Sequence, residues 1–204
     1  MRIFVPMNTD TGQVAVTCDN MIIVDADYID KVAFDLTVNF ERMLNRRIPK
    51  ADTARWIDCV ALDGGVREGK EQTQVVFIHR SGSQRLENFT PGDYADELHA
   101  KAFSDNLGEF VLSAVSEERI ADKEELFLST VALGCSAREV KRLILIPDEQ
   151  YYESVRLALR RADDEKRITV LAMQPMPGGN FRQEILGYSL MNALGIRGEE
   201  LQNL

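Results

Sequence analysis

Short, continuous apolar runs are the feature that most constrains the fold of this chain. Several stretches are rich in β-branched side chains and do not alternate with polar residues. Strands that are buried on both faces have this pattern, whereas strands with one solvent-facing side alternate. The runs therefore predict a parallel sheet that is covered by helices on both sides. The predicted strands are residues 21–24, 75–78, 110–112, 143–146 and 168–173.

Helical spacing of apolar residues falls between these runs. In residues 29–44, the side chains of Ile29, Val32, Leu36 and Phe40 lie on one side of a helix whose other side is polar. The alternation of strands and helices predicts an α/β three-layer sandwich with a mainly parallel central sheet. Further helices are expected at residues 51–62, 91–103, 123–133 (stopped by Gly134), 150–162 and 182–194.

The 204 residues are expected to form a single α/β domain, because no repeat or Pro/Gly-rich linker divides them. Residues 1–20 fall outside the alternation and predict a short N-terminal β-hairpin or an edge extension. Residues 21–175 are the predicted core, and residues 176–204 hold a C-terminal helix. That helix is apolar around much of its surface, which leaves open whether it seals the core or forms a homodimer interface.

Composition argues against several classes of protein. No apolar run is long enough for a transmembrane helix, so no membrane partner is expected. The three cysteines lack the spacing of a disulfide framework or a zinc site, which favours a cytoplasmic location. The formal net charge of −9 argues against a large electrostatic footprint on nucleic acid, but it is compatible with a metal-dependent nuclease.

Acidic residues follow three of the predicted strands. Asp25 and Asp27 come after the first strand, and Asp148 follows the strand at residues 143–146. Because the carboxyl ends of parallel strands lie at one edge of a sheet, these acids are expected to converge. Converging carboxylates repel one another unless a hard cation joins them, so Mg²⁺ or Mn²⁺ is the expected cofactor. The third group, at the start of the helix at residues 123–133, consists of Asp122, Glu124 and Glu125.

The same acids also suit a purely structural role. An Asp between a strand and a helix is most often an N-cap, and Asp27 and Asp148 stand where two such caps belong. Asp25 is harder to explain in this way, because one helix needs only one N-cap. Glu124 and Glu125 favour the start of a helix electrostatically.

Residues 21–29 and 142–152 resemble the NYN branch of the PIN-like nuclease superfamily. The first segment is similar to that family's opening strand, which ends in an Asp and a short turn. The second is similar to a later strand, which normally ends in Ser-Gly-Asp-x-Asp-Phe. The resemblance extends over residues 21–175 in the order of elements, and over about twenty residues in motif. It implies a PIN/NYN-like fold and a Mg²⁺- or Mn²⁺-dependent ribonuclease, with RNA as the partner.

Carried over by position, the resemblance implies that Asp25 and Asp148 bind the metal and that Glu124 or Glu125 completes its shell. Asp27 would belong to the same catalytic group, and a metal-bound water would attack phosphorus. The family motif is incomplete in this chain, which puts activity in doubt. The departures are Ile146 and Pro147 for its Ser and Gly, Gln150 for its second Asp, and Ser129 near a helical Asp.

Two other functions stay open from the sequence. Asp25 and Asp27 also resemble the first motif of haloacid-dehalogenase-type phosphatases, in which Asp25 would be the nucleophile and Asp27 the general acid and base. Against this, no convincing strand-end Lys follows, and residues 79–83 are better explained as a polar turn. The last alternative is a non-catalytic binding or oligomerisation module, in which the acids would cap helices.

Two basic groups are candidates for contacts with substrate phosphates. They are Arg42 and Arg46 near the end of the first helix, and Arg156 and Arg160 on the helix after Asp148. They would serve only if both helices flank the acids, and solvated helix faces with i,i+4 pairs are the simpler interpretation.

Overall fold

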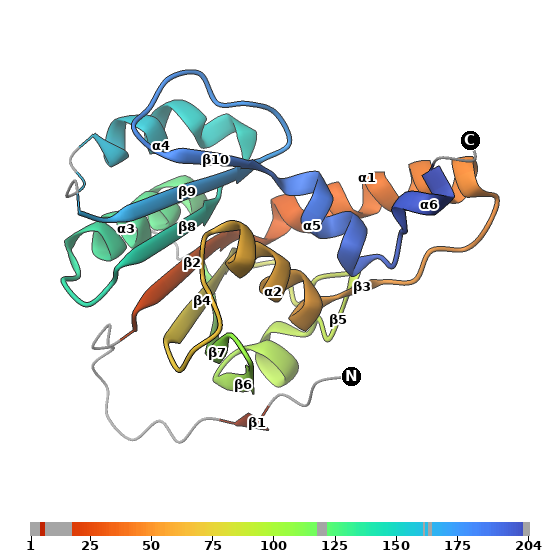
Figure 1. Cartoon of the computed structure of the whole chain (residues 1–204), viewed down its shortest axis with the longest axis horizontal. Coiled ribbons are helices and arrows are strands. Elements are labelled where there is room, and N and C mark those ends of the chain that lie inside the picture. The colour runs from red at the N-terminus through yellow and green to blue at the C-terminus, as the bar shows by residue number, and fades with distance from the viewer. Residues whose placement is uncertain (1–4, 7–17, 118–121, 161, 163–164, 202–204) are drawn as a thin grey trace.

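The structure, a computed structural model, describes residues 5–6, 18–117, 122–160, 162 and 165–201 (Figure 1). Its centre is an eight-stranded sheet in the order β1-β6-β7-β4-β2-β8-β9-β10. A second, two-stranded sheet pairs β3 (Ala51–Asp52) with β5 (Phe89–Thr90). The strands of the large sheet are β1 (Val5–Pro6), β2 (Asn20–Asp25), β4 (Gln72–His79), β6 (Lys101–Asp105), β7 (Gly108–Ser116), β8 (Arg142–Ile146), β9 (Arg167–Ala172) and β10 (Arg182–Ile185).

Six neighbouring strands of the large sheet, from β7 to β10, are parallel. Only β6 and β1, at one edge, run antiparallel to their neighbours. From β2 the chain moves outward through β4 to β7, and it then returns to the other side of β2 to build β8, β9 and β10. This order creates a switch point between β2 and β8, where ligands of doubly wound sheets commonly bind.

Helices cover both faces of the sheet (Figure 1). One core joins the sheet to α1 (Ala26–Leu44), α2 (Thr53–Asp63) and α5 (Leu186–Ala193), with Trp56 fully buried between Phe77 and Phe89. The other core joins it to α3 (Lys123–Ser136) and α4 (Tyr152–Leu159). Short helices complete the chain: η1 (Tyr94–Leu98), η2 (Glu149–Tyr151) and α6 (Gly198–Leu201). The predicted α/β sandwich with a mainly parallel sheet is confirmed.

Two predicted helices contain strands instead. Residues 101–103, at the end of the helix predicted at residues 91–103, belong to β6, where Phe103 stacks on Phe110 across the pairing with β7. Residues 182–185, placed at the start of the last helix, form β10 at the sheet edge. The rest of that helix is α5, whose Leu186 and Leu190 are fully buried in the core.

The sequence predicted that the helix beginning at residue 123 stops at Gly134. In the structure this helix, α3, continues to Ser136. A Cβ atom at Gly134 would lie 2.8 Å from Leu143 Cδ1 and 3.2 Å from Met21 Sδ. The glycine therefore lets α3 approach the sheet closely. The predicted N-terminal hairpin falls mostly on residues 1–4 and 7–17, outside the described part of the chain. No helix among the described residues is both long and apolar enough to cross a membrane.

Candidate functional site

The switch point between β2 and β8 carries a fully buried carboxylate. Asp25 is the last residue of β2, and its side chain is 0% exposed. Its Oδ1 accepts a hydrogen bond from the Tyr28 N–H at 2.9 Å, so Asp25 is the N-cap of α1. The assignment of this cap to Asp27 from the sequence was therefore wrong, since α1 begins one residue after Asp25.

An ammonium group joins the two acids that follow β2. The Nζ atom of Lys123, the first residue of α3, lies 2.7 Å from Asp25 Oδ1 and 3.1 Å from Asp27 Oδ2. The Lys123 side chain is only 6% exposed. Asp27 also accepts a hydrogen bond from the Arg80 N–H at 3.0 Å. A lysine thus lies between Asp25, a predicted metal ligand, and Asp27, predicted to belong to the same catalytic group.

Burial dominates the electrostatics of Asp25. Desolvation raises the pKa of its carboxyl group, and this outweighs the lowering effects of Lys123 and of the Tyr28 N–H. Its Oδ2 atom is buried and accepts no hydrogen bond from the described residues. In this arrangement Asp25 has no contact with solvent, so a substrate could reach it only after a rearrangement.

The other predicted acids each have a local partner. Asp148 caps η2 by accepting from the Gln150 N–H at 3.0 Å, and Asp122 caps α3 by accepting from the Glu125 N–H at 2.8 Å. Glu124 accepts from the Ser154 hydroxyl at 2.6 Å, whereas Glu125 is exposed.

Several of these acids lie near Tyr151, at the carboxyl ends of the parallel strands. Burial raises the pKa of Tyr151, and the charges of Asp25, Asp148, Glu124 and Asp122 raise it further. Even so, the described residues contain no group of three or more His, Cys, Asp or Glu placed to hold one metal ion.

The predicted phosphate-binding arginines do not surround these acids. Arg42 follows Asp25 by 17 residues of α1, which is about 25 Å along the helix axis. Arg46 is held by Glu200 at 2.8 and 3.0 Å, and Arg156 by Glu153 on its own helix. Arg160 is exposed at the end of α4.

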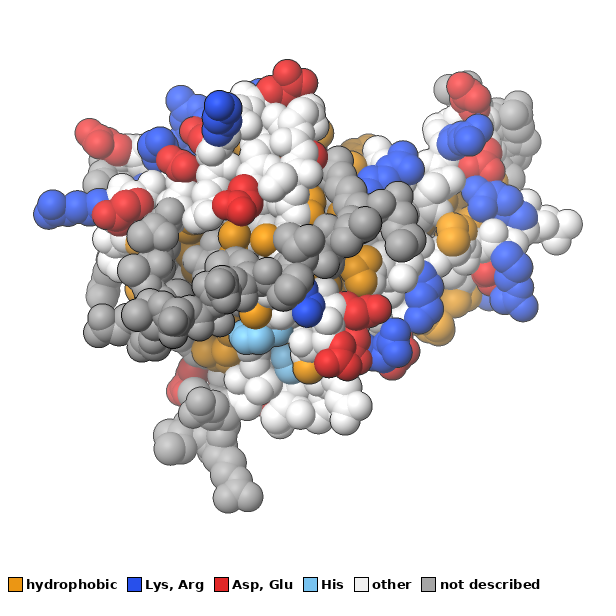
Figure 2. Space-filling view, turned by 90° about the horizontal axis from the view of Figure 1, so that it is seen from below, with side chains coloured by type: hydrophobic (Ala, Val, Ile, Leu, Met, Phe, Trp, Pro, Cys, Tyr) orange, Lys and Arg blue, Asp and Glu red, His pale blue; other side chains and the backbone are white. Residues whose placement is uncertain are grey.

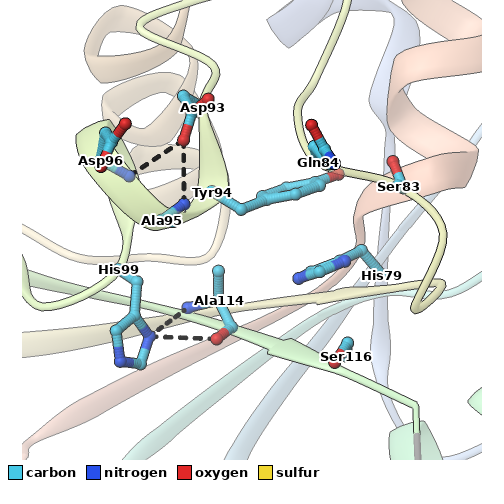
Figure 3. Close-up of a pocket in the computed structure, with 10 residues that line it drawn as sticks. All are labelled: His79, Ser83, Gln84, Asp93, Tyr94, Ala95, Asp96, His99, Ala114 and Ser116. Carbon is cyan, nitrogen blue, oxygen red and sulfur yellow. Dashed lines mark hydrogen bonds between the residues drawn. The ribbon is translucent and has the colours of Figure 1, made fainter.

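A pocket of about 540 Å³ opens at the carboxyl ends of β4 and β7 (Figure 3). His79 and Ser116 end these strands opposite each other, and Tyr94 begins η1 above them. The rings of His79 and Tyr94 stack with centroids 3.9 Å apart and an angle of 8° between their planes. Other polar side chains around the pocket are Ser83, Gln84, Asp93, Asp96 and His99. On this face, histidine side chains lie next to acidic ones (Figure 2).

A hydrogen bond to the backbone and the stacking on Tyr94 orient the His79 ring. Its Nδ1 lies 2.9 Å from the carbonyl oxygen of Arg80, which can only accept, so Nδ1 carries a proton. In the neutral ring Nε2 is then an acceptor, and it points into the pocket (Figure 3). Asp27 accepts a hydrogen bond from the N–H of Arg80, the residue after His79, so the pocket lies beside Asp27. Burial raises the pKa of Tyr94, and the charge of Asp27 raises it further.

The sequence was compared with protein families, curated proteins and solved structures. The family described as "Family of unknown function (DUF6621)" matches residues 15–201. The chain belongs to the DUF6621 family. No curated protein and no solved structure matches it.

Sequence reasoning missed Lys123 and His79, the two residues that define the candidate site most closely. Lys123 lies 98 positions from Asp25, and no local motif links the two. The signal in the sequence is the position of Lys123 at the start of a helix that follows a strand. The phosphatase hypothesis calls for a lysine, and the sequence alone did not identify Lys123 as that residue. His79 was assigned to a polar turn, although it is the last residue of a buried strand and points into the pocket.

Proposed function

We propose that this chain is a non-catalytic binding domain that keeps a nuclease-like α/β architecture. The observation that carries the proposal is the Lys123 ammonium, which lies between Asp25 and Asp27 at 2.7 and 3.1 Å. Asp25 and Asp148, the two acids expected to bind a metal, cap helical segments instead. A salt-bridged and capping carboxylate contributes to folding without any bound metal.

The departures from the NYN motif support the same conclusion. Ile146 and Pro147 are buried where that family has Ser and Gly, and Gln150 replaces its second Asp. Compared with the family motif, the end of β8 therefore lacks a small residue and a polar side chain. In a nuclease these groups would lie next to the substrate phosphate. A PIN/NYN-like origin of the fold is therefore part of the proposal, with RNA cleavage lost.

The ligand of the proposed domain would occupy the pocket beside His79 and Tyr94. Its volume of about 540 Å³ falls within the range of small-molecule sites. Asp93 and Asp96 line it, and the charges of Asp27 and Asp30 act on Tyr94. A negative lining with a histidine acceptor favours a small cationic molecule, such as one with an ammonium or guanidinium group.

A calorimetric titration with agmatine, which carries both groups, tests the ligand class. We expect saturable binding that weakens in Asp96→Asn and is unchanged in Glu153→Gln, which removes the same charge from α4 on the other face of the sheet. Succinate, a shorter molecule of the opposite charge, is the negative probe. Absence of agmatine binding, or equal binding of succinate, would reject the cationic ligand.

A second titration, with Mn²⁺, tests the non-catalytic part of the proposal. We expect no saturable binding that depends on Asp148, and no cleavage of an oligouridine in Mg²⁺ or Mn²⁺. Binding and cleavage that are both lost in Asp148→Asn would establish a metal-dependent ribonuclease and overturn the proposal.

One observation favours a phosphatase as the second candidate. The phosphatase hypothesis requires a lysine beside Asp25, and Lys123 Nζ lies 2.7 Å from it. Hydrolysis of p-nitrophenyl phosphate that is lost in a folded Asp25→Asn variant would favour this candidate. Absence of this hydrolysis in the wild type would reject the phosphatase.

A further inference from the structure

A second cavity lies at the amino ends of the parallel strands, whereas the His79 pocket lies at their carboxyl ends. Its volume is about 590 Å³, and it is lined by the loop after α2 and by the amino ends of β8, β9 and β10. Five of its lining residues are cationic, in a chain whose formal net charge is −9. They are Arg67, Arg142, Lys166, Arg167 and Arg182.

The register of the sheet explains why three of these cations meet. Arg142 is paired with Arg167 across β8 and β9, and Arg182 is paired with Thr169 across β10 and β9. Residues 167 and 169 are two apart, so they and their partners point to the same face of the sheet. That face is the one covered by α2, because Ile144, two residues after Arg142, packs in the core with Trp56. Beyond the end of α2 this face is open, and the cavity forms there.

Acidic side chains of the described residues contact two of these arginines. Arg142 contacts Glu71 at 3.0 Å, and Arg182 contacts Glu184 at 2.7 Å. The charge of Arg182 also acts on Asp63 at the end of α2.

Two other cations are held by uncharged groups. Arg67 donates to the carbonyl oxygens of Leu62 and Val66, and Lys166 donates to those of Ala137 and Val140. The contacts of Arg67 hold it at the loop after α2 without neutralising it, whereas the Lys166 ammonium is held on the α3 side, where Ala137 and Val140 lie. Arg142 Nε is buried and makes no hydrogen bond within the described part of the chain, which leaves one guanidinium donor without an acceptor.

We propose that this cavity binds a small molecule that carries phosphate groups. Guanidinium groups match the geometry of phosphate oxygens, and four of the five cations are arginines. A cavity of about 590 Å³ suits a small ligand better than a long nucleic acid backbone, which would need an extended basic groove. This proposal is independent of the ligand at the His79 pocket.

Titration with inorganic tripolyphosphate at fixed ionic strength tests the proposal. The test variant is Arg167→Gln/Arg182→Gln, because both side chains are exposed at the starts of their strands. The matched control is Arg42→Gln/Arg47→Gln, which removes two exposed arginines from the far end of α1 and the loop after it. We expect the dissociation constant to rise about tenfold or more in the test variant and less than about twofold in the control.

Several results would overturn the proposal. Absence of saturable binding to the wild type would do so, as would equal weakening in both variants, which would indicate a general charge effect. An oligouridine that binds through Arg167 and Arg182 while tripolyphosphate does not would assign the surface to RNA instead. The single variant Arg167→Gln serves as a second test if the double variant is unstable, and it should weaken binding of tripolyphosphate by at least about threefold.

Discussion

At the residue scale, the buried pair of Lys123 and Asp25 is the most consequential contact in the molecule. Removing one member of a buried ion pair leaves the other charge unpaired, which costs about 3–5 kcal/mol. We therefore expect Lys123→Met to lower the free energy of unfolding by roughly that amount, measured by urea denaturation. The control is Lys31→Met, whose side chain is 73% exposed and pairs with Asp35; it should cost less than about 1 kcal/mol. If Lys123→Met lowers the free energy of unfolding no more than the control does, Lys123 and Asp25 do not form a buried ion pair.

The same carboxylate gives a prediction about pH. Burial raises the pKa of Asp25 above its ordinary value of 3.8 despite the contact with Lys123. The folded state then binds this proton more tightly than the unfolded state, so the contribution of Asp25 to stability falls as pH rises from 3.8 through the folded pKa. The free energy of unfolding of the wild type minus that of Asp25→Asn should decrease over this window and then level off. An increase with pH in urea titrations would show that Lys123 outweighs burial.

At the scale of elements, a glycine decides how closely α3 packs on the sheet. We expect Gly134→Ala to destabilise the protein by about 1–3 kcal/mol, because its Cβ would lie 2.8 Å from the fully buried side chain of Leu143. The gain in helix propensity, about 1 kcal/mol, offsets only part of this cost. Gly198→Ala is the control, since a Cβ atom there meets nothing within 4 Å and α6 keeps its helical geometry. A Gly134→Ala protein that melts at or above the wild-type temperature would contradict the close approach.

The elements also show how far the sequence predicts this fold. The five apolar runs all became strands. In β2, β4, β8 and β9 the run is buried on both faces, as expected inside a parallel sheet, whereas β7 alternates between buried and more exposed residues. Edge strands obey no such rule: β10 is Arg-Gln-Glu-Ile and is held by its backbone pairing with β9. The candidate site depended on contacts that no local pattern encodes. Asp25 was found from its place after a strand, whereas Lys123 and the basic cavity result from packing between segments that are distant in sequence.

At the scale of the whole molecule, a group of acids lies at the carboxyl ends of the parallel strands and a group of arginines at their amino ends. Asp25, Asp27 and Asp148 lie at or beyond the carboxyl ends of their strands, whereas Arg142 and Arg167 begin theirs. The formal net charge of −9 does not reveal this distribution, because it sums the charges of the whole chain. The two groups are far apart because parallel strands all begin at one end of the sheet and all finish at the other.

This separation predicts that the two proposed ligands bind independently. The six residues of β2 span about 20 Å, and sites this far apart without shared side chains usually contribute additively. Saturating agmatine should therefore change the dissociation constant of tripolyphosphate by less than about twofold, as measured by calorimetry of each ligand in the presence of the other. A larger change in either direction must be reciprocal, since coupling between two binding sites is the same free energy seen from either ligand. Such coupling would mean that the sheet or α2 takes up two arrangements, and the charge division would then be part of a switch rather than of two separate sites.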